Sequence, residues 1–74
     1  SLLSRTSDTT LTARIKAEML AQGGNFAHKV KVVTENGTSY LMGVITRQQG
    51  DLAVTLTQSV GGVQKIVKLF EYLD

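Results

Sequence analysis

The Asn36-Gly37 dipeptide stands between two strand-like runs and limits the possible folds of this chain more than any other segment. Both positions tolerate positive φ, so such a pair is the strongest short-range signal for a two-residue β-hairpin. From Lys29 to Glu35, Val30 and Val32 alternate with Lys31 in a run rich in β-branched residues, and Ser39 to Ile45 supplies a second run. The sequence therefore predicts two antiparallel strands over residues 29–35 and 39–45.

A helix is expected before the hairpin. Small oxygen-bearing side chains over residues 6–9 are suited to accept hydrogen bonds from the free amides of a helix N-terminus. Leu11, Ile15 and Met19 then recur every four residues, which predicts a helix from about residue 9 to residue 22 with this stripe toward the core. Gly23-Gly24 ends it, because glycine accepts left-handed dihedral angles without strain, and residues 25–28 form a loop.

A second helix and a third strand are expected after the hairpin. Thr46 and Gln49 have the spacing of a capping box, so this helix begins near Arg47 and runs to about Ser59. Its expected core stripe is Leu52, Ala53, Leu56 and Val60. Gly61-Gly62 ends the helix, and residues 63–73 form the strand.

Length and composition limit the chain to one small domain. It has 74 residues and no cysteine, so it can hold one core without a disulfide. Apolar residues make up 42%, which excludes disorder for the whole chain, and the net charge of +2 is mild. The expected fold is α+β: a two-layer αββαβ sandwich with two helices packed on one face of a three-stranded sheet, its strand order left open. Residues 1–6 are interpreted as a linker or disordered terminus and residues 7–74 as the domain.

Three motifs in this order resemble the BON domain family: Val32-Val33-Thr34-Glu35-Asn36-Gly37, Leu41-Met42-Gly43-Val44 and Ser59-Val60-Gly61-Gly62-Val63. The likeness extends from Ser7 to Tyr72 and is greatest to the second domain of a two-domain outer-membrane lipoprotein. It implies a periplasmic module that contacts anionic phospholipid at the inner face of the outer membrane and supports envelope integrity. It also implies a companion BON domain as partner and a lipid anchor upstream of this fragment.

The residues needed for catalysis are missing from the pattern. The chain has a single histidine, His28, expected to be solvated, and its carboxylates fall on separate elements. No metal-ligand spacing occurs, and neither glycine pair matches a phosphate-binding loop, so no metal, no cofactor and no enzymatic activity are expected. The αββαβ order is broadly similar to that of KH domains, but the Gly-x-x-Gly loop is missing and no nucleic acid is expected as a partner.

The first helix carries the candidate lipid-binding residues. Leu20 projects roughly 140° from the centre of the core stripe, and Lys16 lies one turn earlier on the same outward face. A leucine entering the headgroup region beside a lysine suits an anionic bilayer. The expected site is Lys16, Leu20, Ala13 and Ala17, with Arg14 as a weaker member. Thr10 stands where the family relative has a tryptophan, and Glu18 where it has glutamine, which leaves weak membrane affinity open.

The sheet offers a second candidate surface. If Leu41, Gly43, Ile45, Ile66 and Phe70 face the helices, alternation leaves the opposite face bare. That face would hold Tyr40, Met42, Val44, Val67 and Leu69. Such an apolar surface is typical of a protein interface, for the companion domain or for weak self-association. The reversed register is the alternative for the strands, and a protein-interaction domain without lipid affinity is the alternative for the function.

Overall fold

Over residues 2–74 the chain forms two α-helices and three strands in the expected αββαβ order. The computed structural model describes the backbone of residues 2–74 and, except at residues 2–7, 23 and 25, their side chains. The elements are α1 (Leu2–Glu18), a π-helical turn η1 (Met19–Gly23), a 3-10 helix η2 (Gly24–Lys29), β1 (Lys31–Glu35), β2 (Thr38–Ile45), α2 (Arg47–Gln58) and β3 (Lys65–Tyr72). This confirms the α+β fold class.

The sheet is mixed, with β2 in its centre. β1 pairs with β2 antiparallel and β3 pairs with β2 parallel, so the strand order is β1-β2-β3. Asn36 and Gly37 connect β1 to β2 with φ values of 51° and 78°. The positive angles at both residues match the two-residue hairpin that the dipeptide predicts.

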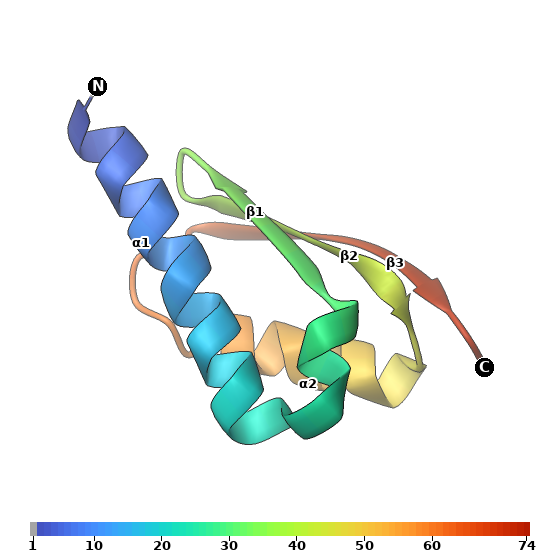
Figure 1. The fold of residues 1–74 in the computed structure, drawn as a ribbon. Coiled ribbons are helices and arrows are strands. Elements are labelled where there is room, and N and C mark those ends of the chain that lie inside the picture. The colour runs from blue at the N-terminus through green and yellow to red at the C-terminus, as the bar shows by residue number, and fades with distance from the viewer. Residues whose placement is uncertain (1) are drawn as a thin grey trace.

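Both helices lie on the same side of the sheet, and the core fills the space between the layers (Figure 1). Leu41 and Ile45 of β2 are fully buried, and Ile66 and Phe70 of β3 pack against the core. The expected register is therefore correct, and the reversed register is wrong. The buried hydrophobic residues are Leu11, Ile15, Met19, Phe26, Ala27, Val30, Val32, Leu41, Ile45, Ala53, Leu56 and Val60.

Helix α1 begins at Leu2, earlier than the start near residue 9 that the sequence predicts. Asp8, which was expected to help cap the helix, lies inside it. Its carboxylate instead accepts hydrogen bonds from the backbone amides of Asn36, at 2.9 Å, and Gly37, at 3.3 Å. Asp8 thereby fastens α1 to the hairpin turn. The domain boundary between residues 6 and 7 stays a prediction.

The connection from α1 to β1 is helical, whereas a loop was expected over residues 25–28. The helical path continues through η1 to Gly23, and Gly24 then turns it at φ 67° into η2. β1 consequently starts at Lys31, two residues later than expected. Gly43 of β2 lies against this connection: a Cβ placed there would collide with the carbonyl oxygen of Lys29.

Helix α2 begins with the expected capping box. Thr46 Oγ1 accepts from the Gln49 amide at 3.1 Å, and Gln49 Oε1 accepts from the Thr46 amide at 3.0 Å. The expectation that Leu52 belongs to the core is wrong, since its side chain is 38% exposed. Thr57 is fully buried instead, because its hydroxyl donates to the carbonyl oxygen of Ala53 at 2.7 Å and needs no water.

Candidate functional site

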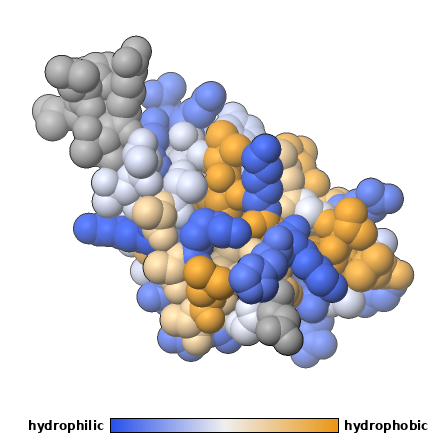
Figure 2. All heavy atoms as spheres, in the orientation of Figure 1, coloured by the Kyte–Doolittle hydropathy of each residue, from blue (hydrophilic) through white to orange (hydrophobic). Residues whose placement is uncertain are grey.

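The outer face of α1 presents a strip of small apolar side chains that ends in a leucine. Ala13 and Ala17 are exposed, and Leu20, one residue into η1, is 53% exposed. Ala21 is exposed beside it and lengthens the strip, which sequence reasoning missed because it treated residues 9–22 as a regular α-helix. Pale and orange apolar atoms run down the lower half of α1 between blue polar ones (Figure 2).

Lys16 does not hold a free ammonium group at the surface as expected. Its Nζ donates to the carbonyl oxygens of Val30, at 2.7 Å, and Ala27, at 3.0 Å. These carbonyls belong to η2 and to the residue that follows it, so the ammonium ties α1 to the segment that leads into β1. The side chain is partly buried. In this structure the Lys16 side chain therefore holds α1 against the segment from η2 to β1.

Among the described side chains of α1, over residues 8–18, Arg14 is the exposed cation. At 100° per residue, Arg14 and Lys16 flank the strip of Ala13, Ala17 and Leu20 on opposite sides. The Arg14 side chain therefore lies on one flank of the strip and is long enough to extend past it. The other flank holds Lys16, whose ammonium group is hydrogen-bonded to backbone carbonyls. Of the expected site, the structure leaves the apolar strip and Arg14 open to solvent.

The face of the sheet opposite the helices carries the second expected surface. Val44 is 49% and Leu69 54% exposed, and the other three expected members are partly exposed. The strand register places Tyr40 beside Val67 and Met42 beside Leu69, so side chains of β2 and β3 form neighbouring pairs across the sheet. The structure therefore brings Tyr40, Met42, Val44, Val67 and Leu69 to one uncovered face.

Three other features of the described residues bear on the kind of site: metal-ligating side chains, the histidine and membrane-spanning helices. Among residues 2–74, no three side chains of the types His, Cys, Asp and Glu gather as metal ligands would. His28 is exposed, as expected. No helix within these residues is long and apolar enough to span a bilayer.

Fold and sequence together define the class of the protein. Residues 7–74 match the BON domain family. The chain belongs to that family, as the hairpin, the Leu-x-Gly strand and the Gly-Val segment indicate.

Two relatives extend the comparison beyond the family. The chain is 39% identical over 67 residues to the outer membrane lipoprotein DolP of Haemophilus influenzae, covering 90% of this chain and 35% of the relative. It is 38% identical over 67 residues to a 21 kDa hemolysin of Actinobacillus pleuropneumoniae, covering 90% of this chain and 34% of that protein. The chain thus spans about a third of the length of these relatives.

A solved structure shares the fold at low sequence identity. It is that of CdsD, a structural protein of the type III secretion system of Chlamydia trachomatis. The TM-score is 0.71 at 19% identity, with 89% of this chain and 32% of the other covered. The likeness extends to the fold alone.

Proposed function

We propose that this chain is a non-enzymatic BON module that binds anionic phospholipid at the inner face of the outer membrane, in the periplasm, and supports envelope integrity. The observation that carries the proposal is the exposed strip on α1, which ends in a leucine that is 53% exposed and has Arg14 on its open flank. The similarity to an outer membrane lipoprotein supports the location, and the proposal includes a lipid anchor upstream of the domain.

The strip suits shallow contact with a bilayer surface. Small alanine side chains let the helix lie close to the headgroups, and Leu20 can enter the boundary with the acyl chains. Arg14 can reach phosphate with its charged end while its stem lies along the strip. A cation near an anionic surface contributes about 1 kcal/mol, so binding by so small a site is weak and depends on salt.

The proposed test is co-sedimentation with phosphatidylglycerol vesicles, compared with phosphatidylcholine vesicles. Leu20→Asp should abolish binding, and Arg14→Glu should weaken it about thirtyfold, because the reversal changes the surface attraction by two charges of about 1 kcal/mol each. Leu52→Asp is the matched control, since it replaces a partly exposed leucine on α2 and should bind as the wild type does. Equal binding by all three variants would exclude this site.

A second candidate function rests on the uncovered sheet face. Val44 and Leu69 are about half exposed there, beside Tyr40, Met42 and Val67. Such a face fits a protein partner, namely the companion BON domain of the same protein or a second copy of this chain, without any lipid affinity.

Sedimentation equilibrium at high protein concentration tests the second candidate. Met42→Lys places a charge in the middle of the face and should abolish self-association, whereas Leu52→Asp should leave it unchanged. A domain that stays monomeric at every concentration and binds phosphatidylglycerol vesicles would favour the lipid-binding function alone.

A further inference from the structure

The outer edge of β3 has no strand beside it in the described part of the chain. β3 pairs with β2 on its inner side only, and every residue of β3 is at least partly exposed. The amide of Lys65 donates to Gly37 O at 3.3 Å and the amide of Leu73 to Ile45 O at 2.8 Å. Because backbone groups alternate sides along a strand, the odd-numbered residues between them point to β2. The amides and carbonyls of Ile66, Lys68 and Phe70 therefore point outward.

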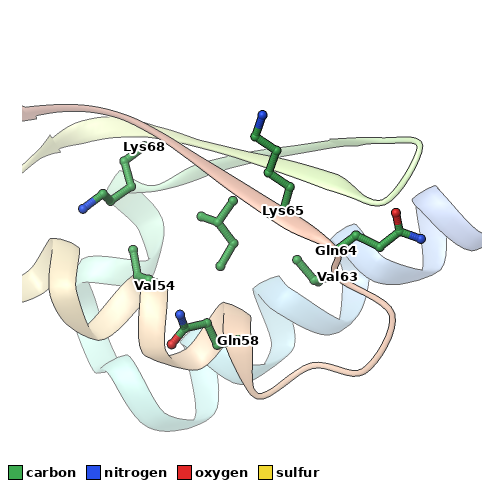
Figure 3. A pocket seen from close by; sticks show the side chains of 7 residues that line it. Val54, Gln58, Val63, Gln64, Lys65 and Lys68 are labelled. Carbon is green, nitrogen blue, oxygen red and sulfur yellow. The ribbon is translucent and has the colours of Figure 1, made fainter.

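A groove runs beside this edge, between β3 and α2. Its volume is about 360 Å³, and its lining is apolar at Val54, Val63 and Ile66 and polar at Gln58, Gln64, Lys65 and Lys68. In Figure 3, Val54 points from α2 toward β3, Lys68 extends on the α2 side of the sheet, and Lys65 extends to the opposite side. The volume is at the lower end of the range for small-molecule sites, and the groove is partly open to solvent.

Three properties of this edge fit one kind of occupant. Unpaired backbone groups accept an added strand, and alternate side chains of that strand would enter the apolar groove. Lys65 and Lys68 place one cation on each side of the added strand. A lipid would use the charge and the apolar floor but not the outward amides, so the edge favours a peptide.

We infer that the β3 edge and the groove beside it bind an extended acidic segment of another protein by β-strand addition. The partner strand pairs with the outward groups of Ile66, Lys68 and Phe70. One of its apolar side chains packs over Val54 and Ile66, and its carboxylates lie beside the two lysines. This partner surface is separate from the α1 strip, and it adjoins the uncovered sheet face only at Lys65.

The probe for this inference is a fluorescent nine-residue peptide made of three repeats of threonine, glutamate and valine, followed by anisotropy. Glutamates three positions apart fall on opposite faces of a strand, as Lys65 and Lys68 do. The wild-type domain should bind this peptide, and replacement of its glutamates by lysines should abolish binding. The variant Lys65→Glu/Lys68→Glu should bind about tenfold more weakly, since each exposed pair contributes modestly. Lys29→Glu/Lys31→Glu is the control, with the same change of net charge at exposed residues of η2 and β1.

Backbone pairing is tested separately with two N-methylated versions of the peptide. Methyl groups on every second amide block one edge of the strand, so one version should lose binding and the other should keep it. Retained binding by both versions would overturn strand addition. No binding of the parent peptide would overturn the inference. The two lysines would then be explained as charges that prevent the edge strand from pairing with other chains. Weakened binding of phosphatidylglycerol vesicles, without any peptide binding, would assign the groove to lipid and equally overturn it.

Discussion

Replacing Gly43 with alanine tests the close approach of the η2–β1 connection to the centre of the sheet. The added methyl group would collide with the carbonyl oxygen of Lys29, and the nearest other atoms are also backbone, at Lys29 and Val30. A flexible side chain can rotate away from such a contact, whereas a backbone carbonyl cannot. The same residue has a φ of 150°, which side-chain-bearing residues rarely adopt.

The two effects add to a large share of the stability of such a domain. Strained backbone angles cost about 1–3 kcal/mol, and an extra carbon in a packed region costs about 1–3 kcal/mol. A domain of this length has a free energy of unfolding of about 4–11 kcal/mol. Gly43→Ala should therefore lower the midpoint of thermal unfolding by about 10 °C or more.

Circular dichroism during thermal unfolding, together with urea titration, measures this loss. Gly61→Ala is the control, because no atom lies within 4 Å of the Cβ it would add. That variant should unfold within about 0.5 kcal/mol of the wild type. A Gly43→Ala domain as stable as the Gly61→Ala domain would show that the connection does not need the glycine.

Three further predictions concern polar contacts that hold elements together. Lys16→Met should keep the packing of the stem but leave two carbonyl oxygens without their donor, which lowers the free energy of unfolding by about 1–3 kcal/mol in a urea titration. Asp8→Ala should cost about 1–2 kcal/mol and should speed hydrogen exchange at the amides of Asn36 and Gly37, measured by NMR. Thr46→Ala should cost about 1 kcal/mol through loss of the helix cap, whereas Thr46→Ser should restore the stability measured by thermal unfolding.

The elements that could be predicted from the sequence are those specified by local chemistry. Asn36-Gly37 predicts its turn because the positive φ angles are a property of those two residues. Thr46 and Gln49 predict the start of α2 because both capping bonds join neighbours in the chain. The stripe of Leu11, Ile15 and Met19 is predicted because helical periodicity alone places it on one face.

The features that could not be predicted depend on partners distant in the sequence. Asp8 is of a residue type that commonly caps helices, but the amides that donate to it belong to the hairpin turn. Lys16 was expected to be free because the carbonyls that bind it come from a segment interpreted as an open loop. The hydropathy of Leu52 predicted that it would be buried, but it is exposed. Thr57 is buried because its hydroxyl donates to a carbonyl oxygen of the same helix, and hydropathy does not indicate such a bond.

Candidate sites were predictable to the extent that exposure follows from periodicity. The uncovered sheet face follows from strand alternation, and both Leu20 and Arg14 are exposed as the helical angle requires. The outer edge of β3 was not predicted, because strand order could not be read from the sequence. Only the pairing of β3 with β2 shows which backbone groups are left outward.

The mixed sheet also implies an order of assembly. β1 and β2 are joined by a two-residue turn, so they can pair within microseconds. β3 is parallel to β2, so it can pair only after the connection that contains α2 has brought the chain back to the start of β2. The strand that docks last and is held on one side is the strand expected to open at the lowest free energy. A ligand bound along the outer edge of β3 would therefore oppose the opening of this strand, because it binds only when β3 is paired with β2, and it would stabilise the folded domain by mass action.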